Sequence, residues 1–222
     1  MIGLGLPDLG GRPLKLLCLG AHCDDIEIGA GATVLRLLRD NPGAEVLWVI
    51  FSSNEARKTE ARACAERLLA GAGKQDIRIL EFRDGFLPYA GVAVKEAFEA
   101  LKLEFVPDLI LTHYRHDLHQ DHRQVNELTW NTWRNHLILE YEIPKWDGDM
   151  GIPNFFMPIA EADLDAKIAA LLDCYASQRG KSWFTEDTFR ALPRLRGMEC
   201  ASPSRFAEAF HCRKAVLGAP LP

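Results

Sequence analysis

Apolar runs of strand length alternate along this chain with stretches in which apolar residues recur every three to four positions. The pattern begins at residues 14–19, a nearly continuous apolar run that Gly20 interrupts, and continues at residues 29–39, where apolar residues have helical spacing. The run at residues 45–52 is almost entirely apolar, as is typical of a parallel strand covered on both faces. The pattern therefore predicts a succession of strand, turn and helix units.

The same alternation extends to the end of the sequence. It predicts further extended segments at residues 77–82, 108–112, 137–143, 154–159 and 206–214. It predicts further helices at residues 55–70, 92–105, 119–133, 161–175 and 185–196. Repeated strand–helix alternation with short connections predicts an α/β fold, in which a mostly parallel sheet is wound with right-handed crossovers and flanked by helices on both faces.

The length of 222 residues suits one α/β domain, 1–222, with a substantial core. The net charge of −5 argues against nucleic-acid binding through a basic face, so we expect a small-molecule partner. The six cysteines form no CxxC pair, which indicates free thiols in a reducing compartment. We find no signal peptide and no apolar run long enough for a membrane span, so we expect a soluble, cytoplasmic protein. A homo-oligomer is compatible with these features.

The first group of chemically interesting residues follows the first predicted strand. His22, Asp24 and Asp25 lie in the turn, and Glu27 opens the predicted helix, at the end of the strand where open α/β sheets bind ligands. A His and an Asp three residues apart can bind one cation, while the neighbouring carboxylate takes a proton from water. Alternatively, Asp24 or Asp25 caps the helix. Both interpretations fit these residues equally well.

The second group follows the predicted strand at residues 108–112. Four of the seven histidines fall within ten residues there: His113, His116, His119 and His122. Packing explains such a cluster poorly, because a buried histidine needs one partner and has no reason to recur. His119 and His122 are three apart at the start of a predicted helix and share one face, so that one can bind metal while the other contacts a substrate oxygen.

Two later features are interpreted as structural. His211 lies in the predicted terminal strand, which favours packing over catalysis. Five basic residues could hold an anionic substrate, but scattered surface charge is the preferred explanation for them: Arg179, Lys181, Arg190, Arg194 and Arg196.

The two clusters together resemble the motifs of the LmbE-like, or PIG-L, family of metal-dependent N-deacetylases. Residues 21–29, AHCDDIEIG, resemble its His-Pro-Asp-Asp-Glu type motif, and residues 119–123, HQDHR, resemble its His-Pro-Asp-His type motif. Order, spacing and strand context agree, and the similarity covers most of the chain, including residues 207–210. The resemblance implies a Rossmann-like α/β fold. Cys23 and Gln120 replace the family's prolines, so both turns lose a fixed φ.

The resemblance also implies roles for individual residues. The implied metal ligands are His22, Asp25 and His122. The implied catalytic residues are Asp24 as general base, His119 as the imidazole that stabilises the oxyanion or protonates the leaving amine, and Asp121 as the residue that orients His119. Arg57 and Asp84 resemble positions that contact the sugar. The implied cofactor is Zn²⁺, although two histidines and one aspartate suit Fe²⁺ as well.

The implied activity is hydrolysis of the N-acetyl group from an N-acetylglucosamine-type amino sugar conjugate, which gives a free amine and acetate. One alternative is an amidase with the same metal site that acts on a larger acyl group or a non-sugar amine. Another is a Rossmann-like nucleotide-binding regulatory protein. The turn after the first strand disfavours the latter, because a histidine and two carboxylates stand where pyrophosphate would require glycines.

Overall fold

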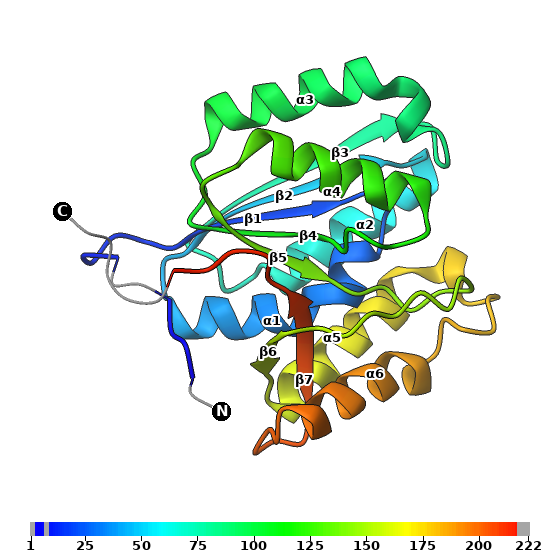
Figure 1. Cartoon of the computed structure of the whole chain (residues 1–222). Helices are drawn as coiled ribbons and strands as arrows, with labels where there is room; N and C mark the ends of the chain where they lie inside the picture. The colour runs from blue at the N-terminus through cyan, green and yellow to red at the C-terminus, as the bar shows by residue number, and fades with distance from the viewer. Residues whose placement is uncertain (1–2, 7–8, 217–222) are drawn as a thin grey trace.

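The computed structural model describes residues 3–6 and 9–216, and in this part of the chain the strands form one seven-stranded sheet of order β3-β2-β1-β4-β5-β7-β6 (Figure 1). The strands are β1 Lys15–Gly20, β2 Glu45–Ser52, β3 Lys74–Phe82, β4 Leu109–His113, β5 Leu137–Tyr141, β6 Phe155–Pro158 and β7 Ala207–His211. Strands β1 to β5 pair in parallel, whereas β7 pairs antiparallel with both β5 and β6. The predicted α/β fold with a mostly parallel sheet is confirmed.

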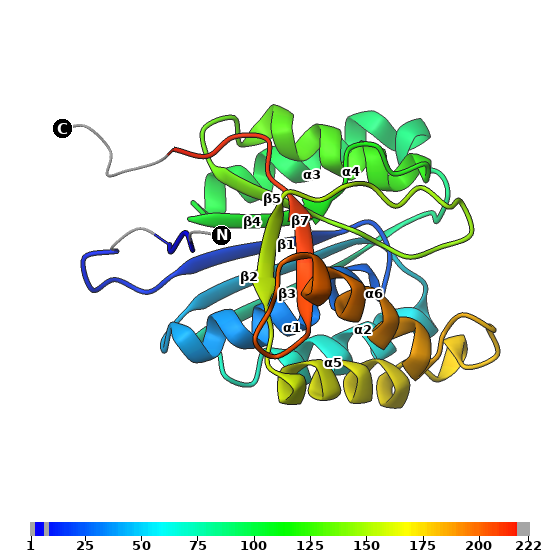
Figure 2. The same ribbon diagram turned by 60° about the horizontal axis from the view of Figure 1, so that its bottom comes forward.

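Helices cover both faces of the sheet, as Figures 1 and 2 show from two directions. The α-helices are α1 Asp25–Asp40, α2 Glu55–Leu68, α3 Gly91–Glu104, α4 Gln120–Thr132, α5 Glu161–Cys174 and α6 Glu186–Glu199. Helices α3 and α4 lie on one face, and α1, α2, α5 and α6 lie on the other. Two short 3₁₀ helices, η1 Leu87–Ala90 and η2 Ala176–Gln178, were not predicted from the sequence.

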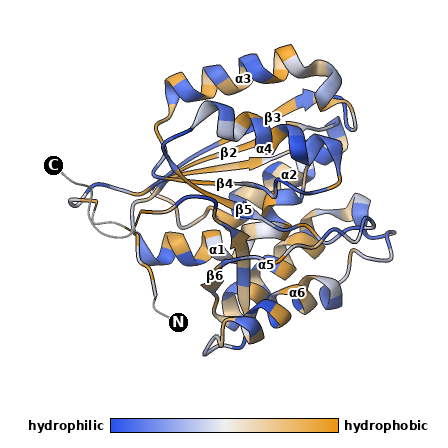
Figure 3. Cartoon of the chain, viewed as in Figure 1, coloured by the Kyte–Doolittle hydropathy of each residue, from blue (hydrophilic) through white to orange (hydrophobic). Residues whose placement is uncertain are grey.

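The central strands separate two hydrophobic cores. Successive side chains of a strand point to opposite faces, so Leu16 and Cys18 of β1 join the core under α1, whereas Leu17 and Leu19 join the core under α3 and α4. Figure 3 shows the consequence, since the central strands are coloured as hydrophobic. The continuous apolar runs in the sequence therefore reflect burial on both faces. No helix within the described residues is long and apolar enough to cross a membrane.

The start of α1 is the main correction to the predicted elements. The predicted helix opened at Glu27, with apolar residues at helical spacing over residues 29–39, but α1 begins two residues earlier, at Asp25. Gly29 therefore lies inside the helix, where it lets α1 approach β5 closely. A Cβ atom on Gly29 would lie 2.3 Å from Cδ2 of Tyr141. Glycine here serves packing rather than a turn.

Strand order brings the two sequence clusters together. The chain proceeds from β1 through β2 to β3 on one side, and then crosses to β4 on the other side of β1. Adjacent strands β1 and β4 are thus followed by connections that diverge, which is the position where open α/β sheets bind ligands. The turn carrying His22 and the segment carrying His119 both leave the sheet at this point.

Candidate metal centre

In the turn after β1, the adjacent carboxylates of Asp24 and Asp25 have different surroundings. Asp24 has a left-handed backbone with φ of 92°, a conformation whose strain is about 1–3 kcal/mol for a residue other than glycine. Asp25 accepts a hydrogen bond on Oδ2 from the backbone N–H of His22 at 2.7 Å. Within the described residues, the side chain of Asp24 accepts no capping hydrogen bond from the first turn of α1. The structure therefore does not use Asp24 as a side-chain cap.

Donor atoms of three side chains from the two clusters converge. Nδ1 of His22 lies 3.1 Å from Nε2 of His122 and 3.4 Å from Oδ2 of Asp25, and Nε2 of His122 lies 3.6 Å from Oδ1 of Asp25. Ligands bound tetrahedrally to zinc at about 2.1 Å are separated by about 3.4 Å from one another. The donor set and its spacing therefore fit a zinc ion.

The outward ring nitrogen of each histidine faces a carboxylate. Nε2 of His22 lies 3.1 Å from Oδ2 of Asp121, and Nδ1 of His122 lies 2.8 Å from Oδ2 of Asp117. Metal-binding histidines commonly donate their second N–H to such a carboxylate, which fixes the tautomer. The arrangement leaves Nδ1 of His22 and Nε2 of His122 as the atoms available to a metal.

His113 is part of the centre, although the sequence analysis gave it no role. Its Nε2 lies 3.2 Å from Oδ2 of Asp25, and its ring stacks on that of His122 with centroids 4.0 Å apart. The same Nε2 accepts the backbone N–H of Ala21 at 2.9 Å, so its lone pair is already engaged. We interpret His113 as a residue that packs beneath the centre. Its place as the last residue of β4, directly below the site, is consistent with this.

Asp117 and Lys145 were also missed as partners of the site. Besides contacting His122, Asp117 lies 2.9 Å from Nζ of Lys145, which in turn contacts Asp149. Asp117 belongs to the histidine-rich segment and could have been considered with it. Lys145 belongs to a loop without any motif, and its contact depends on how that loop folds back.

Asp24 pairs with Arg57 beside the donor atoms. Nη2 of Arg57 lies 3.0 Å from Oδ2 of Asp24 and also donates to the carbonyl of Cys23. Burial raises the pKa of the Asp24 carboxyl to about 7, an effect that Arg57 opposes and Asp25 reinforces. A carboxylate with a pKa near neutrality suits a general base. Arg57, expected to contact the sugar, holds this carboxylate in the structure.

His119 lies over the two histidine ligands proposed from the sequence. Its ring centroid is 4.7 Å from that of His22 and 4.6 Å from that of His122. Nδ1 of His119 accepts the backbone N–H of Asp121 at 3.3 Å, so a neutral ring carries its proton on Nε2. Burial, together with the neighbouring His22, lowers the pKa of His119.

Among the described residues, the Asp121 carboxylate contacts His22 instead of the expected His119. The backbone of Asp121, rather than its side chain, contacts His119, and the carboxylate faces His22. Asp84 contacts the same imidazole, with Oδ1 3.2 Å from Nε2 of His22, but its side chain is 79% exposed and lies at the edge of the site.

Cys23 is turned away from the donor atoms. Its thiol donates to the carbonyl of Ser52 at 3.7 Å. Burial raises the pKa of this thiol to about 12, so it is not a thiolate at neutral pH. The Cys23 thiol is therefore not one of the converging donor atoms.

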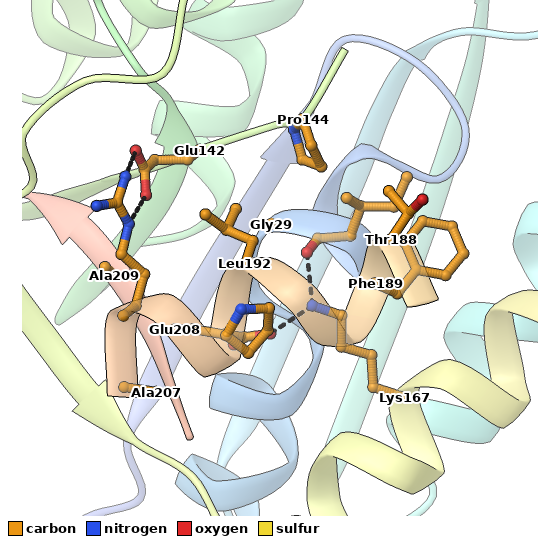
Figure 4. A pocket seen from close by; sticks show the side chains of 13 residues that line it. Gly29, Glu142, Pro144, Lys167, Thr188, Phe189, Leu192, Ala207, Glu208 and Ala209 are labelled. Atoms are coloured by element: carbon orange, nitrogen blue, oxygen red, sulfur yellow. Dashed lines mark hydrogen bonds and ion pairs between the residues drawn. The ribbon is translucent and has the colours of Figure 1, made fainter. Parts of the chain in front are cut away.

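A separate cavity of about 20 Å³ lies between α1, α6 and β7 (Figure 4). Two buried ion pairs line it: Lys167 with Glu208 at 2.7 Å, and Arg196 with Glu142 at 2.7 Å. Arg196 was interpreted from the sequence as surface charge, which is wrong, because its guanidinium is needed to pair the buried Glu142. This cavity can hold about one water molecule and is distinct from the metal centre.

Residues 17–133 match the model of the PIG-L family, described as GlcNAc-PI de-N-acetylase. This segment is more than half of the chain and contains all the metal ligands and catalytic residues expected from the sequence. The chain belongs to the PIG-L family. The protein is therefore a deacetylase, and PIG-L deacetylases are metal-dependent enzymes. Membership favours this activity over a nucleotide-binding regulatory role.

Several solved structures have the same fold as this chain. The conserved protein TT1542 from Thermus thermophilus has 22% identity and a TM-score of 0.72, covering 94% of this chain and 99% of its own. The N,N'-diacetylchitobiose deacetylase from Pyrococcus horikoshii has 22% identity and a TM-score of 0.68, covering 94% and 86%. The 4-carboxy-2-hydroxymuconate hydratase from Pseudomonas putida has 17% identity and a TM-score of 0.71, covering 94% and 100%. At these identities the likeness concerns the fold alone.

Proposed function

We propose that the protein is a zinc-dependent hydrolase that removes the N-acetyl group from an N-acetylglucosamine-type amino sugar conjugate, giving a free amine and acetate. The convergence of His22, Asp25 and His122 is the observation that carries this proposal. Donor atoms of these three side chains lie 3.1–3.6 Å apart, with Asp25 and His122 buried and His22 partly buried, beside a carboxylate that makes no capping bond to the described first turn of α1. Fe²⁺ would fit the same donors. The deacetylase neighbour that acts on diacetylchitobiose supports an amino sugar as the substrate.

Zinc bound by these three side chains would supply a Lewis acid that polarises the amide carbonyl and acidifies a water molecule. Asp24 receives the proton of this water. Its carboxylate has a pKa of about 7, close enough to neutrality for it to be ionised in a useful fraction of molecules and basic enough to accept a proton. Arg57 holds Asp24 in place through the contact at 3.0 Å.

His119, whose ring lies next to those of His22 and His122, is the second residue proposed to act on the amide. Because Nδ1 accepts a backbone N–H, Nε2 carries a proton even in the neutral ring. This N–H can stabilise the negative charge that develops on the amide oxygen. The leaving amine takes the proton that Asp24 received from water, because a neutral imidazole that gave up its Nε2 proton would become an anion. The lowered pKa of His119 favours the neutral form of this donor before the reaction begins.

Asp84 is the proposed sugar contact at the edge of the site. Its exposed carboxylate is free to accept hydrogen bonds from sugar hydroxyl groups. Arg57 is the second proposed sugar contact, although its guanidinium already forms an ion pair with Asp24. The six cysteines, all within the described residues, are free, which suits the proposed cytoplasmic location.

Acetate release from a panel of N-acetylglucosamine conjugates tests this function. The panel contains lipid-, nucleotide- and thiol-linked conjugates, each paired with the same compound bearing a longer N-acyl chain. We expect zinc-loaded protein to release acetate from at least one N-acetyl conjugate and to hydrolyse its longer-chain partner more slowly. Preferential hydrolysis of the longer chain would instead establish the amidase alternative. No hydrolysis of any compound would contradict the proposal for amino sugars.

A further inference from the structure

Asp121 occupies an unusual position between two parts of the site. It lies in the first turn of α4, and its side chain is fully buried. Its carboxylate oxygen Oδ2 lies 3.1 Å from Nε2 of His22, which belongs to the turn after β1. A buried carboxylate needs several hydrogen bonds to remain ionised. The other hydrogen-bond partners of Asp121 therefore determine how firmly its carboxylate is held.

These other partners are backbone N–H groups of the segment after β3. Gly85 donates to Oδ2 at 2.8 Å, and Leu87 donates to Oδ1 at 3.2 Å. Each carboxylate oxygen of Asp121 therefore accepts a hydrogen bond from its own backbone donor. Together these two bonds fix the orientation of the carboxylate, with Oδ2 facing His22. Gly85 has φ of +78°, a conformation that favours glycine and that directs its N–H to Asp121.

Asp84 offers a comparison within the same structure. Its Oδ1 lies 3.2 Å from the same nitrogen of His22, so two carboxylates face one N–H. Asp121 is fully buried and doubly anchored, whereas the Asp84 side chain is 79% exposed. An exposed contact of this kind contributes little, because solvent competes for it and the side chain loses entropy on forming it. Asp84 can therefore leave His22 for another partner.

We propose that Asp121 is the positioning residue for the metal ligand His22, and that it couples this ligand to the 84–87 turn that presents Asp84 to the substrate. The inference rests on the metal site of the proposed function. It divides the two acidic residues by role: Asp121 orients His22 and keeps Nδ1 available to the metal, while Asp84 serves substrate contact and is dispensable for metal binding. Orientation by such a carboxylate is typically worth about 10- to 100-fold in metal affinity.

The test compares Asp121→Asn with Asp84→Asn, the same chemical change on two carboxylates that face one atom. Zinc affinity is measured by competition with a chromogenic chelator, and KM and kcat are measured with an active conjugate. We expect Asp121→Asn to lose about 10- to 100-fold in zinc affinity. We expect Asp84→Asn to bind zinc as the unaltered protein does and to show a raised KM. Equal zinc affinities in the two variants, or a larger loss in Asp84→Asn, would overturn the inference.

A second pair of variants keeps the test decisive if Asp121→Asn does not fold. Gly85→Ala retains the carboxylate but strains the positive-φ turn that fixes it, and the space around Gly85 accommodates a Cβ, with the nearest atom at 3.8 Å. Gly43→Ala is the matched control, since Gly43 has φ of +89° and no described neighbour within 4 Å. We expect a several-fold loss of zinc affinity in Gly85→Ala alone. Unchanged affinity in a folded Gly85→Ala protein would overturn the inference.

Failure of this inference is separable from failure of the proposed function. If the unaltered protein binds no zinc, the proposed metal site itself is wrong. If the unaltered protein binds zinc stoichiometrically and Asp121→Asn binds it equally well, only the role of Asp121 is wrong.

Discussion

Arg57 of α2 and Asp24 of the turn after β1 form an ion pair of 3.0 Å next to the converging donor atoms. The guanidinium also donates to the carbonyl of Cys23 and lies 5.6 Å from the ring centroid of Tyr175. These three contacts fix the position of the Arg57 guanidinium. Arg57 in turn fixes the position of the Asp24 carboxylate, which is proposed as the general base. Arg57, which was expected to contact substrate, thus also lowers the pKa of the Asp24 carboxyl against the larger effect of burial.

Asp24→Asn tests the role of this carboxylate. The amide cannot accept a proton from water, so we expect kcat to fall by about 10²- to 10⁴-fold. Zinc affinity should remain near that of the unaltered protein, because the proposed ligands are retained. Steady-state kinetics and a zinc titration on the same preparation check both points. Near-normal turnover would exclude Asp24 as the base.

Arg57→Met should change the pH dependence of activity. Asp24 must be ionised to act as a base, so activity rises as pH increases through its pKa. Removing the Arg57 cation removes an influence that lowers this pKa, so the pKa of Asp24 rises. We expect the acid limb of the kcat/KM profile to move to higher pH by about one unit. A raised KM with an unmoved acid limb would mean that Arg57 serves substrate binding alone.

Glu208→Gln should destabilise the fold without touching the metal centre. Glu208 accepts the backbone N–H groups of Ala32 and Thr33 inside α1, and Nζ of Lys167 donates to Glu208 and to the carbonyl of Ile28 (Figure 4). Neutralising one partner leaves a buried charge, so we expect the free energy of unfolding to fall by about 3–5 kcal/mol. Denaturant unfolding of both proteins in the presence of chelator measures this loss in the free energy of unfolding.

The exposed pair of Lys58 and Glu81 provides the control for that prediction. Glu81→Gln makes the same chemical change at the surface, where we expect an effect of at most about 1 kcal/mol. A loss of stability in Glu208→Gln no larger than that in Glu81→Gln would contradict the proposed importance of the buried pair.

Local sequence pattern predicted the strands well because burial on both faces leaves long apolar runs. The predicted strand at 45–52 coincides with β2, Glu45–Ser52. The start of α1 was predicted two residues late, at Glu27 in place of Asp25, because the first turn carries polar residues and shows no apolar spacing.

The resemblance to the PIG-L motifs implied that His22, Asp25 and His122 lie together, whereas the strand order that places β1 beside β4 was not predicted. The motifs could not indicate which carboxylate faces which imidazole. The contact of Asp121 with His22 depends on backbone N–H groups of a third segment, at Gly85 and Leu87. Such contacts depend on long-range packing and leave no local trace in the sequence.

Titration of metal-free protein with zinc, with acetate release measured at each point, tests the central claim most directly. We expect no turnover after treatment with chelator, and a rise in turnover that reaches its maximum near one zinc per chain, because His22, Asp25 and His122 form one site. Asp25→Asn, analysed in parallel, should require far more zinc to reach any activity. Acetate release that persists in chelator, or that is independent of added metal, would contradict a metal-dependent deacetylase built on these residues.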